Sequence, residues 1–165
     1  MRVLVAYGSR NGATAGLARM IGTALLARGL DTEVLAADDV YGLAGFDAVI
    51  VAGALYYGRW HRAARSFVRR LADELRQMPV WLVSSGPLDD SATTTEIPPV
   101  PQVRLLSAVI GAREHVTFGG RLATDAIGFP ARAMARTRSG DWRDATQVRD
   151  WSQSVAEELL SRLVP

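Results

Sequence analysis

The stretch "VAYGSRNGAT", residues 5–14, joins a short apolar run to a loop of small polar residues that contains two glycines. The apolar run predicts a buried strand that ends at Gly8. Directly after the loop, Leu17, Ile21 and Leu25 recur with the spacing of one helix face. The stretch therefore predicts a strand, a tight polar loop and the N-terminus of a helix, in that order.

The same alternation continues along the chain. Short aliphatic segments closed by small residues are typical of strands, and there are five: residues 2–7, 32–36, 47–53, 80–84 and 114–118. Segments of helical period follow them: a first helix ending at Gly29, then residues 61–76, 103–110 and 146–163. Strands that are apolar on both faces and alternate with helices predict an α/β domain with a doubly wound, five-stranded parallel sheet and helices on both faces.

Three further features complete the predicted organisation. Asp144 and Gln147 are spaced as a capping box for the last helix. Two stretches, 86–102 and 122–143, do not fit the alternation and are expected to be loops that are either functional or mobile. No linker divides the chain, so we expect one domain over residues 1–165.

Composition excludes several classes of protein. The chain has 165 residues and a net charge of +2, and all nineteen basic residues are arginine. The lack of lysine excludes a P-loop lysine, and the lack of cysteine excludes disulfides and thiolate metal sites. The arginines are dispersed, so nucleic-acid binding is not expected. No apolar run approaches the ~18 residues of a transmembrane segment, and strand-like sequence starts at Arg2, so we expect a cytoplasmic protein.

The first loop has the properties of a phosphate site. In a doubly wound sheet, ligands bind at the carboxyl ends of the strands. Ser9, Asn11 and Thr14 offer hydroxyl and amide donors just before a helix N-terminus, which attracts anions. The loop matches neither GxGxxG nor GxxxxGK, which leaves a phosphomonoester as the candidate ligand. The alternative is an ordinary strand-to-helix turn that binds nothing.

The loop resembles the T-x-T-G-x-T phosphate loop of flavodoxins, with Ser9, Asn11, Gly12 and Thr14 at matching places. A closer resemblance is to the menaquinone-dependent protoporphyrinogen IX dehydrogenases of the flavodoxin-like family. It extends to "GALYYGRWH", residues 53–61, to "FVRR" and "MP" within residues 67–79, and to "SGDWRDATQVRDW", residues 139–151. The chain departs from that family after the fifth strand, where its segment is shorter and poor in aromatic residues.

The resemblance implies a flavodoxin-like fold with strand order 2-1-3-4-5 and non-covalently bound FMN. It places the FMN phosphate on the first loop and the flavin ring across the loops after the third and fourth strands, where Tyr56, Tyr57 and Trp60 are expected to hold it. It also implies that the peptide at Gly58 faces the flavin N5. The implied cofactor-binding residues are Ser9, Arg10, Asn11, Gly12, Ala13, Thr14, Ala54, Leu55, Tyr56, Tyr57, Gly58, Ser85, Gly86, Pro87, Leu88, Gly120 and Arg121.

Other candidate residues are few. His61 is a weak candidate for a proton relay; the alternative is a histidine that starts a helix. We expect no metal site, and we expect Asp89 and Asp90 to cap a turn. The arginines of the second predicted helix are expected to form a solvated face: Arg62, Arg65, Arg69 and Arg70.

The resulting expectation is an FMN-dependent oxidoreductase, related to protoporphyrinogen IX dehydrogenase, that transfers electrons or hydride. The alternative is a flavodoxin that carries electrons between partner proteins. Such carriers are typically strongly acidic, so the positive net charge favours the enzyme. The expected partner is a small-molecule substrate, with a quinone as one candidate, or a redox protein; the oligomeric state, monomer or homodimer, is left open.

Overall fold

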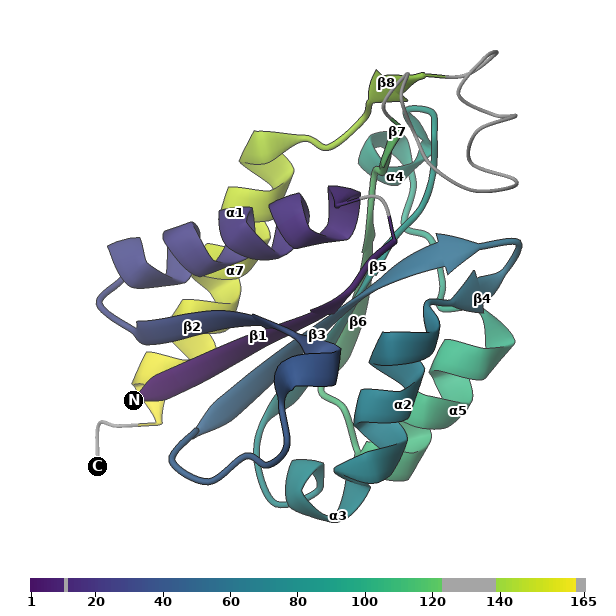
Figure 1. Cartoon of the computed structure of the whole chain (residues 1–165). Coiled ribbons are helices and arrows are strands. Elements are labelled where there is room, and N and C mark those ends of the chain that lie inside the picture. The colour runs from purple at the N-terminus through teal and green to yellow at the C-terminus, as the bar shows by residue number, and fades with distance from the viewer. Residues whose placement is uncertain (11, 123–138, 163–165) are drawn as a thin grey trace.

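The computed structural model describes residues 1–10, 12–122 and 139–162, and its centre is a parallel sheet (Figure 1). The strands are β1 (Arg2–Gly8), β2 (Asp31–Ala36), β3 (Ala48–Tyr56), β5 (Val80–Ser85) and β6 (Glu114–Phe118). They lie in the order β2-β1-β3-β5-β6, and each neighbouring pair is parallel. This is the predicted order of the five main strands, so the predicted flavodoxin-like architecture is confirmed.

Helices cover both faces of the sheet (Figure 1). The face with α1 (Ala13–Ala27) and α7 (Ala145–Ser161) lies opposite the face with α2 (Arg62–Arg70), α3 (Ala72–Leu75) and α5 (Pro101–Ile110). Smaller elements are η1 (Ala37–Asp39), β4 (Arg59–Trp60), α4 (Ser91–Thr94), β7 (Arg121–Leu122) and β8 (Gly140–Asp141). Within the described ranges, no helix is long and apolar enough to cross a membrane.

The central strands β1, β3 and β5 contribute alternate side chains to two hydrophobic cores. Leu4 and Val49 join Phe67 in the core under α2 and α5. Val5 and Ile50 join the core under α1 and α7, where Leu17, Ile21 and Leu25 are buried as their spacing predicts. Burial on both faces explains why these strands are continuously apolar.

Several predicted boundaries are wrong. The third strand does not end at Gly53 but runs to Tyr56 and pairs with β4. The second predicted helix is interrupted at Leu71, which separates α2 from α3. The stretch 86–102, predicted as a loop, contains α4 and the start of α5. Most of the other predicted loop, 122–143, lies outside the described residues.

The predicted capping box of α7 is half correct. The Asp144 carboxylate accepts hydrogen bonds from the backbone N–H groups of Thr146 and Gln147, at 2.8 and 2.9 Å. The Gln147 side chain does not bond back to Asp144. It donates instead to the backbone oxygen of Ala92, at 2.7 Å, and so joins α7 to α4.

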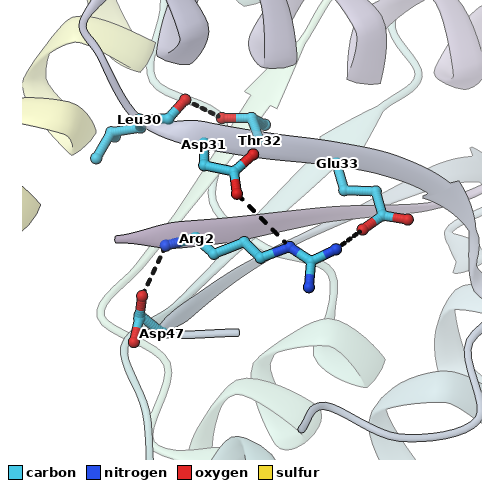
Figure 2. A network of polar contacts seen from close by, with 6 residues as sticks. All are labelled: Arg2, Leu30, Asp31, Thr32, Glu33 and Asp47. Carbon is cyan, nitrogen blue, oxygen red and sulfur yellow. Dashed lines mark hydrogen bonds and ion pairs between the residues drawn. The ribbon is translucent and has the colours of Figure 1, made fainter. Parts of the chain in front are cut away.

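At the amino edge of the sheet, Arg2 is the centre of a polar network (Figure 2). Its guanidinium group contacts Glu33 at 2.7 Å and Asp31 at 3.7 Å, and its backbone N–H donates to Asp47 at 2.6 Å. The same guanidinium lies over the Phe46 ring, 4.8 Å from its centre. These contacts tie the starts of β1, β2 and β3 together.

Candidate flavin site at the carboxyl edge

The loop after β1 is held by its own polar groups. The Ser9 hydroxyl oxygen accepts a hydrogen bond from the backbone N–H of Gly12, at 3.1 Å. Gly12 precedes α1, and its carbonyl accepts the first helical bond, from Gly16 at 3.0 Å. Asn11, the remaining polar residue of the predicted phosphate loop, lies outside the described residues.

Thr14 is the most informative residue of this loop. Its side chain is fully buried in the first turn of α1, and its Oγ1 has no hydrogen-bond partner within the described parts of the chain. A buried hydroxyl without a partner costs free energy, and such groups are rare in folded proteins. A phosphate oxygen at the helix N-terminus is an acceptor that would satisfy it.

The β3–β4 hairpin forms the second wall of the site. Tyr57 and Gly58, with φ angles of 48° and 71°, form the two-residue turn between the paired residues Tyr56 and Arg59. Positive φ at both central positions is the pattern of a type I′ hairpin, and it is unusual for a tyrosine. Tyr57 is 78% exposed, so its ring is available at the tip of the hairpin.

Trp60 is the exception among the predicted aromatic residues. It is 1% exposed and packs against Gly53, where an added Cβ would lie 2.5 Å from the indole ring. Its Nε1–H donates to the Ser84 hydroxyl at 3.0 Å. The prediction that Trp60 helps to hold the flavin ring is therefore wrong, because the core encloses the indole; Tyr56 and Tyr57 are the two aromatics that keep exposed surface.

The loops after β5 and β6 lie against each other. The backbone N–H of Gly86 donates to the carbonyl of Phe118 at 3.3 Å, and that of Gly120 donates to the carbonyl of Pro87 at 2.8 Å. Gly86 also lies against the Leu55 side chain of β3, and Leu88 lies next to Gly120. These contacts bring together most of the predicted ring-binding residues; Ser85 ends β5 as a buried residue, and Arg121 is exposed in β7.

A connection that was not predicted joins these loops to the start of α1. The backbone N–H of Trp142 donates to Gly120 at 2.9 Å, and the Arg143 guanidinium donates to the carbonyl of Ala13 at 3.3 Å. Arg143 also forms a bidentate ion pair with Asp141, at 2.9 and 2.6 Å. This bonding holds the pKa of Asp141 below its ordinary value and raises that of Arg143. Nothing in the sequence marks an Arg–Asp pair two residues apart as a contact to a distant helix.

His61 caps α2. Its Nδ1 accepts a hydrogen bond from the backbone N–H of Ala63 at 3.2 Å, which leaves Nε2 to carry the hydrogen of the neutral ring. Burial is the largest cause that lowers the pKa of His61. The nearby charge of Asp38 opposes this shift, while those of Arg10 and Arg65 add to it. The structure thus bears out His61 as a helix-start residue, while the proton-relay role stays a prediction.

His115 ends a buried hydrogen-bond chain. The Ser84 hydroxyl accepts a hydrogen bond from Trp60 and shares a second hydrogen bond, of 2.7 Å, with the His115 Nε2. The other ring nitrogen is buried and has no partner among the described residues. Burial lowers the pKa of His115 to about 4, so the ring is neutral near pH 7.

The prediction that the two carboxylates after β5 cap a turn is correct for the Asp89 side chain, whereas Asp90 starts α4 without a side-chain cap and contributes its backbone carbonyl. The Asp89 carboxylate accepts hydrogen bonds from the backbone and hydroxyl of Ser91, and the Asp90 carbonyl accepts from the backbone N–H of Thr93. No group of His, Cys, Asp or Glu in the described ranges has the arrangement of a metal site.

The model of the flavodoxin domain family matches residues 4–141. The chain belongs to the flavodoxin domain family. The predicted resemblance to flavodoxins is therefore confirmed. The closer resemblance to the protoporphyrinogen IX dehydrogenases is not supported by these comparisons.

Individual relatives are distant from this flavodoxin domain. A bifunctional cytochrome P450/NADPH–P450 reductase of Bacillus cereus is 27% identical over 153 residues, which are 90% of this chain and 14% of that protein. The rubredoxin oxygen:oxidoreductase of Desulfovibrio gigas superposes with a TM-score of 0.68 at 12% identity, covering 99% of this chain and 37% of that one. A Streptococcus pneumonia flavodoxin superposes with a TM-score of 0.63 at 19% identity, covering 98% and 99%.

FMN is the cofactor of flavodoxin domains, and the residues of this one fit it. The unpaired Thr14 hydroxyl lies where a phosphate acceptor is expected, and the half-buried Tyr56 and the exposed Tyr57 lie on the neighbouring hairpin. The chain is thus an FMN-binding, electron-transfer domain of the flavodoxin type.

Proposed function

We propose that this flavodoxin domain is an FMN-dependent oxidoreductase that exchanges electrons with a small-molecule substrate. The observation that carries the proposal is the buried Thr14 hydroxyl, unpaired within the described chain, at the first turn of α1. Together with the N-terminus of α1, it supplies the chemistry of a phosphate site at the edge where doubly wound sheets bind their ligands.

The proposed cofactor contacts divide into three groups. Ser9, Arg10, Asn11, Gly12, Ala13 and Thr14 would hold the phosphate. Residues 54–58 and 85–88 would surround the ring, with Tyr56 and Tyr57 against its faces, and Gly120 and Arg121 would complete the rim. When bound, FMN supplies the redox chemistry, while the protein supplies orientation and electrostatics.

The finer form of the proposal concerns the substrate. The resemblance of residues 53–61 and 139–151 to protoporphyrinogen IX dehydrogenases makes oxidation of a porphyrinogen, with a quinone as acceptor, the first reaction to test. The net charge of +2 supports an enzyme over an acidic electron carrier. As a further part of the proposal, residues 1–165 act as one domain in the cytoplasm.

A second candidate function is electron transfer between proteins or domains. It is favoured by the match to the bifunctional cytochrome P450/NADPH–P450 reductase, in which the matching region is 14% of the relative's length. In this case the chain would exchange electrons with a protein surface, and a small substrate would not be needed.

The first experiment is a titration of the purified protein with FMN and with riboflavin, followed by flavin fluorescence and thermal unfolding. We expect saturable quenching and stabilisation by FMN at one flavin per chain. Absence of both effects would refute FMN binding. Turnover of a porphyrinogen with a quinone, followed by porphyrin fluorescence, then separates the enzyme from the carrier, because the carrier would oxidise the porphyrinogen no faster than free FMN does.

A further inference from the structure

We propose that a second site, next to the flavin site, binds a small molecule carrying two or more anionic groups, either carboxylates or phosphates. The site is a cleft of about 630 Å³ above the N-terminus of α2, which we call the arginine cleft. Its lining residues include Arg10 from the β1 loop, Arg59 from the β3–β4 hairpin, and Arg62 and Arg65 from α2.

The charge of the arginine cleft is not neutralised. Four arginines line it, against the single carboxylate of Asp38. With Arg10 assigned to the FMN phosphate, Arg59, Arg62 and Arg65 still outnumber that carboxylate. None of the four forms an ion pair with a carboxylate in the described ranges, although several other arginines do so. The positive field extends along α2, because a neighbouring hollow is lined by Arg62, Arg65 and Ser66 together with Arg69 and Arg70. The prediction that the α2 arginines form a plain solvated face is therefore incomplete, because two of them line both hollows.

Arg65 supplies an independent indication of a ligand. Its Nε is buried, yet finds no hydrogen-bond acceptor in the described structure. Arg70, on the same helix, shows how this chain satisfies a structural arginine: its guanidinium donates to the backbone carbonyls of Val40, at 2.5 Å, and Ala37, at 3.3 Å. Burying a guanidinium N–H without an acceptor costs free energy, and an anion in the cleft would supply that acceptor.

The cleft has the size and walls of a small-molecule site. Pockets for small ligands usually measure roughly 300–1,000 Å³. Tyr56 contributes to its lining. Burial lowers the pKa of His61, which favours the neutral ring, and its Nδ1 accepts from a backbone N–H. The arginines therefore determine the preferred charge of the ligand.

The positions of the arginines favour a ligand with more than one anionic group. Arg62 and Arg65 are three residues apart on α2 and so share a helix face. Arg10 and Arg59 reach the cleft from two separate loops. A molecule with one anionic group would pair with one of these sets and leave the other uncompensated. If this ligand is also the redox substrate, that role rests on the proposed function. The binding of the ligand to the cleft does not depend on the proposed function.

The test is isothermal titration calorimetry on the FMN-loaded protein at low and matched ionic strength. The probes are citrate, pyrophosphate and, as a monoanion control, acetate. We expect citrate or pyrophosphate to bind at least about tenfold more tightly than acetate. Preference for citrate would identify a polycarboxylate ligand, and preference for pyrophosphate a phosphorylated one.

Variants assign the binding to the cleft. Arg62→Gln and Arg65→Gln should each weaken the preferred probe by about tenfold, the loss expected for a charge-assisted hydrogen bond. Arg65→Lys, which keeps the charge but lacks Nε, should have an intermediate effect. Arg19→Gln is the matched control, since Arg19 is an exposed arginine of α1 on the other face of the sheet; it should change the affinity less than twofold. Circular dichroism checks that each variant is folded.

Three results would overturn the proposal: equal affinity for all three anions, equal effects of the cleft and control variants, or release of FMN on addition of the probe. The last result would mean that the probe occupies the cofactor site. Failure of the proposed function would look different, because the purified protein would then retain no FMN. In that case, the same titration on the FMN-free protein still tests the cleft.

Discussion

At the amino edge of the sheet, a single arginine is surrounded by acidic side chains. At the carboxyl edge, by contrast, four arginines line a cleft that contains one acidic side chain. Arg2 pairs with Asp31 and Glu33 and covers the Phe46 ring (Figure 2). The arginine cleft has Asp38 alone as an acidic lining residue. Charges that are compensated within the chain contribute to the fold, while charges left uncompensated are available for a ligand. The two edges should therefore respond differently to mutation.

The largest effect is expected at the carboxyl edge, on cofactor affinity. Thr14→Val keeps the shape of the side chain and removes the unpaired hydroxyl, so FMN affinity should fall by roughly tenfold to a hundredfold, the value of a hydrogen bond to a charged group. Riboflavin affinity should stay nearly constant, because riboflavin has no phosphate. Thr14→Ser, which restores a hydroxyl, should recover FMN binding.

Fluorescence titration with both flavins measures the effect of Thr14→Val. Equal losses for FMN and riboflavin would indicate damage to the loop as a whole and would contradict the assignment. The unfolding free energy of the FMN-free protein should not fall, since the hydroxyl has no partner in the described structure.

The next effect concerns His115, which lies between the two edges. Its pKa is about 4 in the folded protein, below the ordinary value of 6.5. As the pH falls from about 6.5 to about 4, His115 takes up a proton in the unfolded chain but not in the folded chain. The contribution of His115 to the free energy of unfolding is therefore complete above about pH 6.5 and decreases as the pH falls through this range. The ring is partly exposed, so this loss is about 1–2 kcal/mol after allowance for solvent screening.

His115→Gln should remove that part of the pH dependence while keeping a side chain that can bond to Ser84. Urea unfolding of both proteins at several pH values isolates the contribution, because the carboxylates titrate alike in both. Identical pH profiles would show that the folded and unfolded states protonate His115 equally.

A smaller effect is expected at the amino edge. Arg2→Met removes two partly exposed ion pairs and a cation–π contact while keeping the apolar part of the side chain. Exposed contacts of this kind are worth up to about 1 kcal/mol each, so the unfolding free energy should fall by about 1 kcal/mol, and by less at high salt. FMN affinity should not change. A loss of FMN affinity as large as that of Thr14→Val would refute the division between the two edges.

The smallest effect is expected on the redox potential. A cation near the flavin favours its reduced, more negatively charged form, and Arg59 lies on the hairpin proposed to contact the ring. Arg59→Gln should make the midpoint potential of bound FMN more negative, by up to roughly 40 mV, which corresponds to about 1 kcal/mol per electron. Arg19→Gln is again the control. Equal potentials in all three proteins, measured by spectroelectrochemistry, would exclude an electrostatic role for Arg59.

The sequence predicts the sheet well because local patterns determine it. Runs such as residues 3–6 and 80–83 are apolar at every position, and burial on both faces requires this pattern. The β3–β4 hairpin was missed because its turn is Tyr57-Gly58, and a tyrosine at positive φ is not a usual turn signal. The local preference is overridden there by the strand pairing of Tyr56 with Arg59.

The site was predicted less completely, for a related reason. Residues of the first loop are neighbours in sequence, so a motif can identify them. The contact of Arg143 with Ala13, and the meeting of Arg10 with Arg65 in one cleft, depend on how distant segments pack. Composition shows that the chain is rich in arginine, but it does not show which arginines lack an acidic partner.

The packing of Trp60 against Gly53 has an evolutionary consequence. Because a Cβ at position 53 would enter the space of the indole ring, the two positions cannot vary independently. A homologue with alanine or serine at position 53 is expected to carry a smaller residue than tryptophan at position 60. An alignment of close homologues should therefore show covariation of these two positions, and Gly53→Ala should be tolerated in a background where position 60 has already been reduced in size.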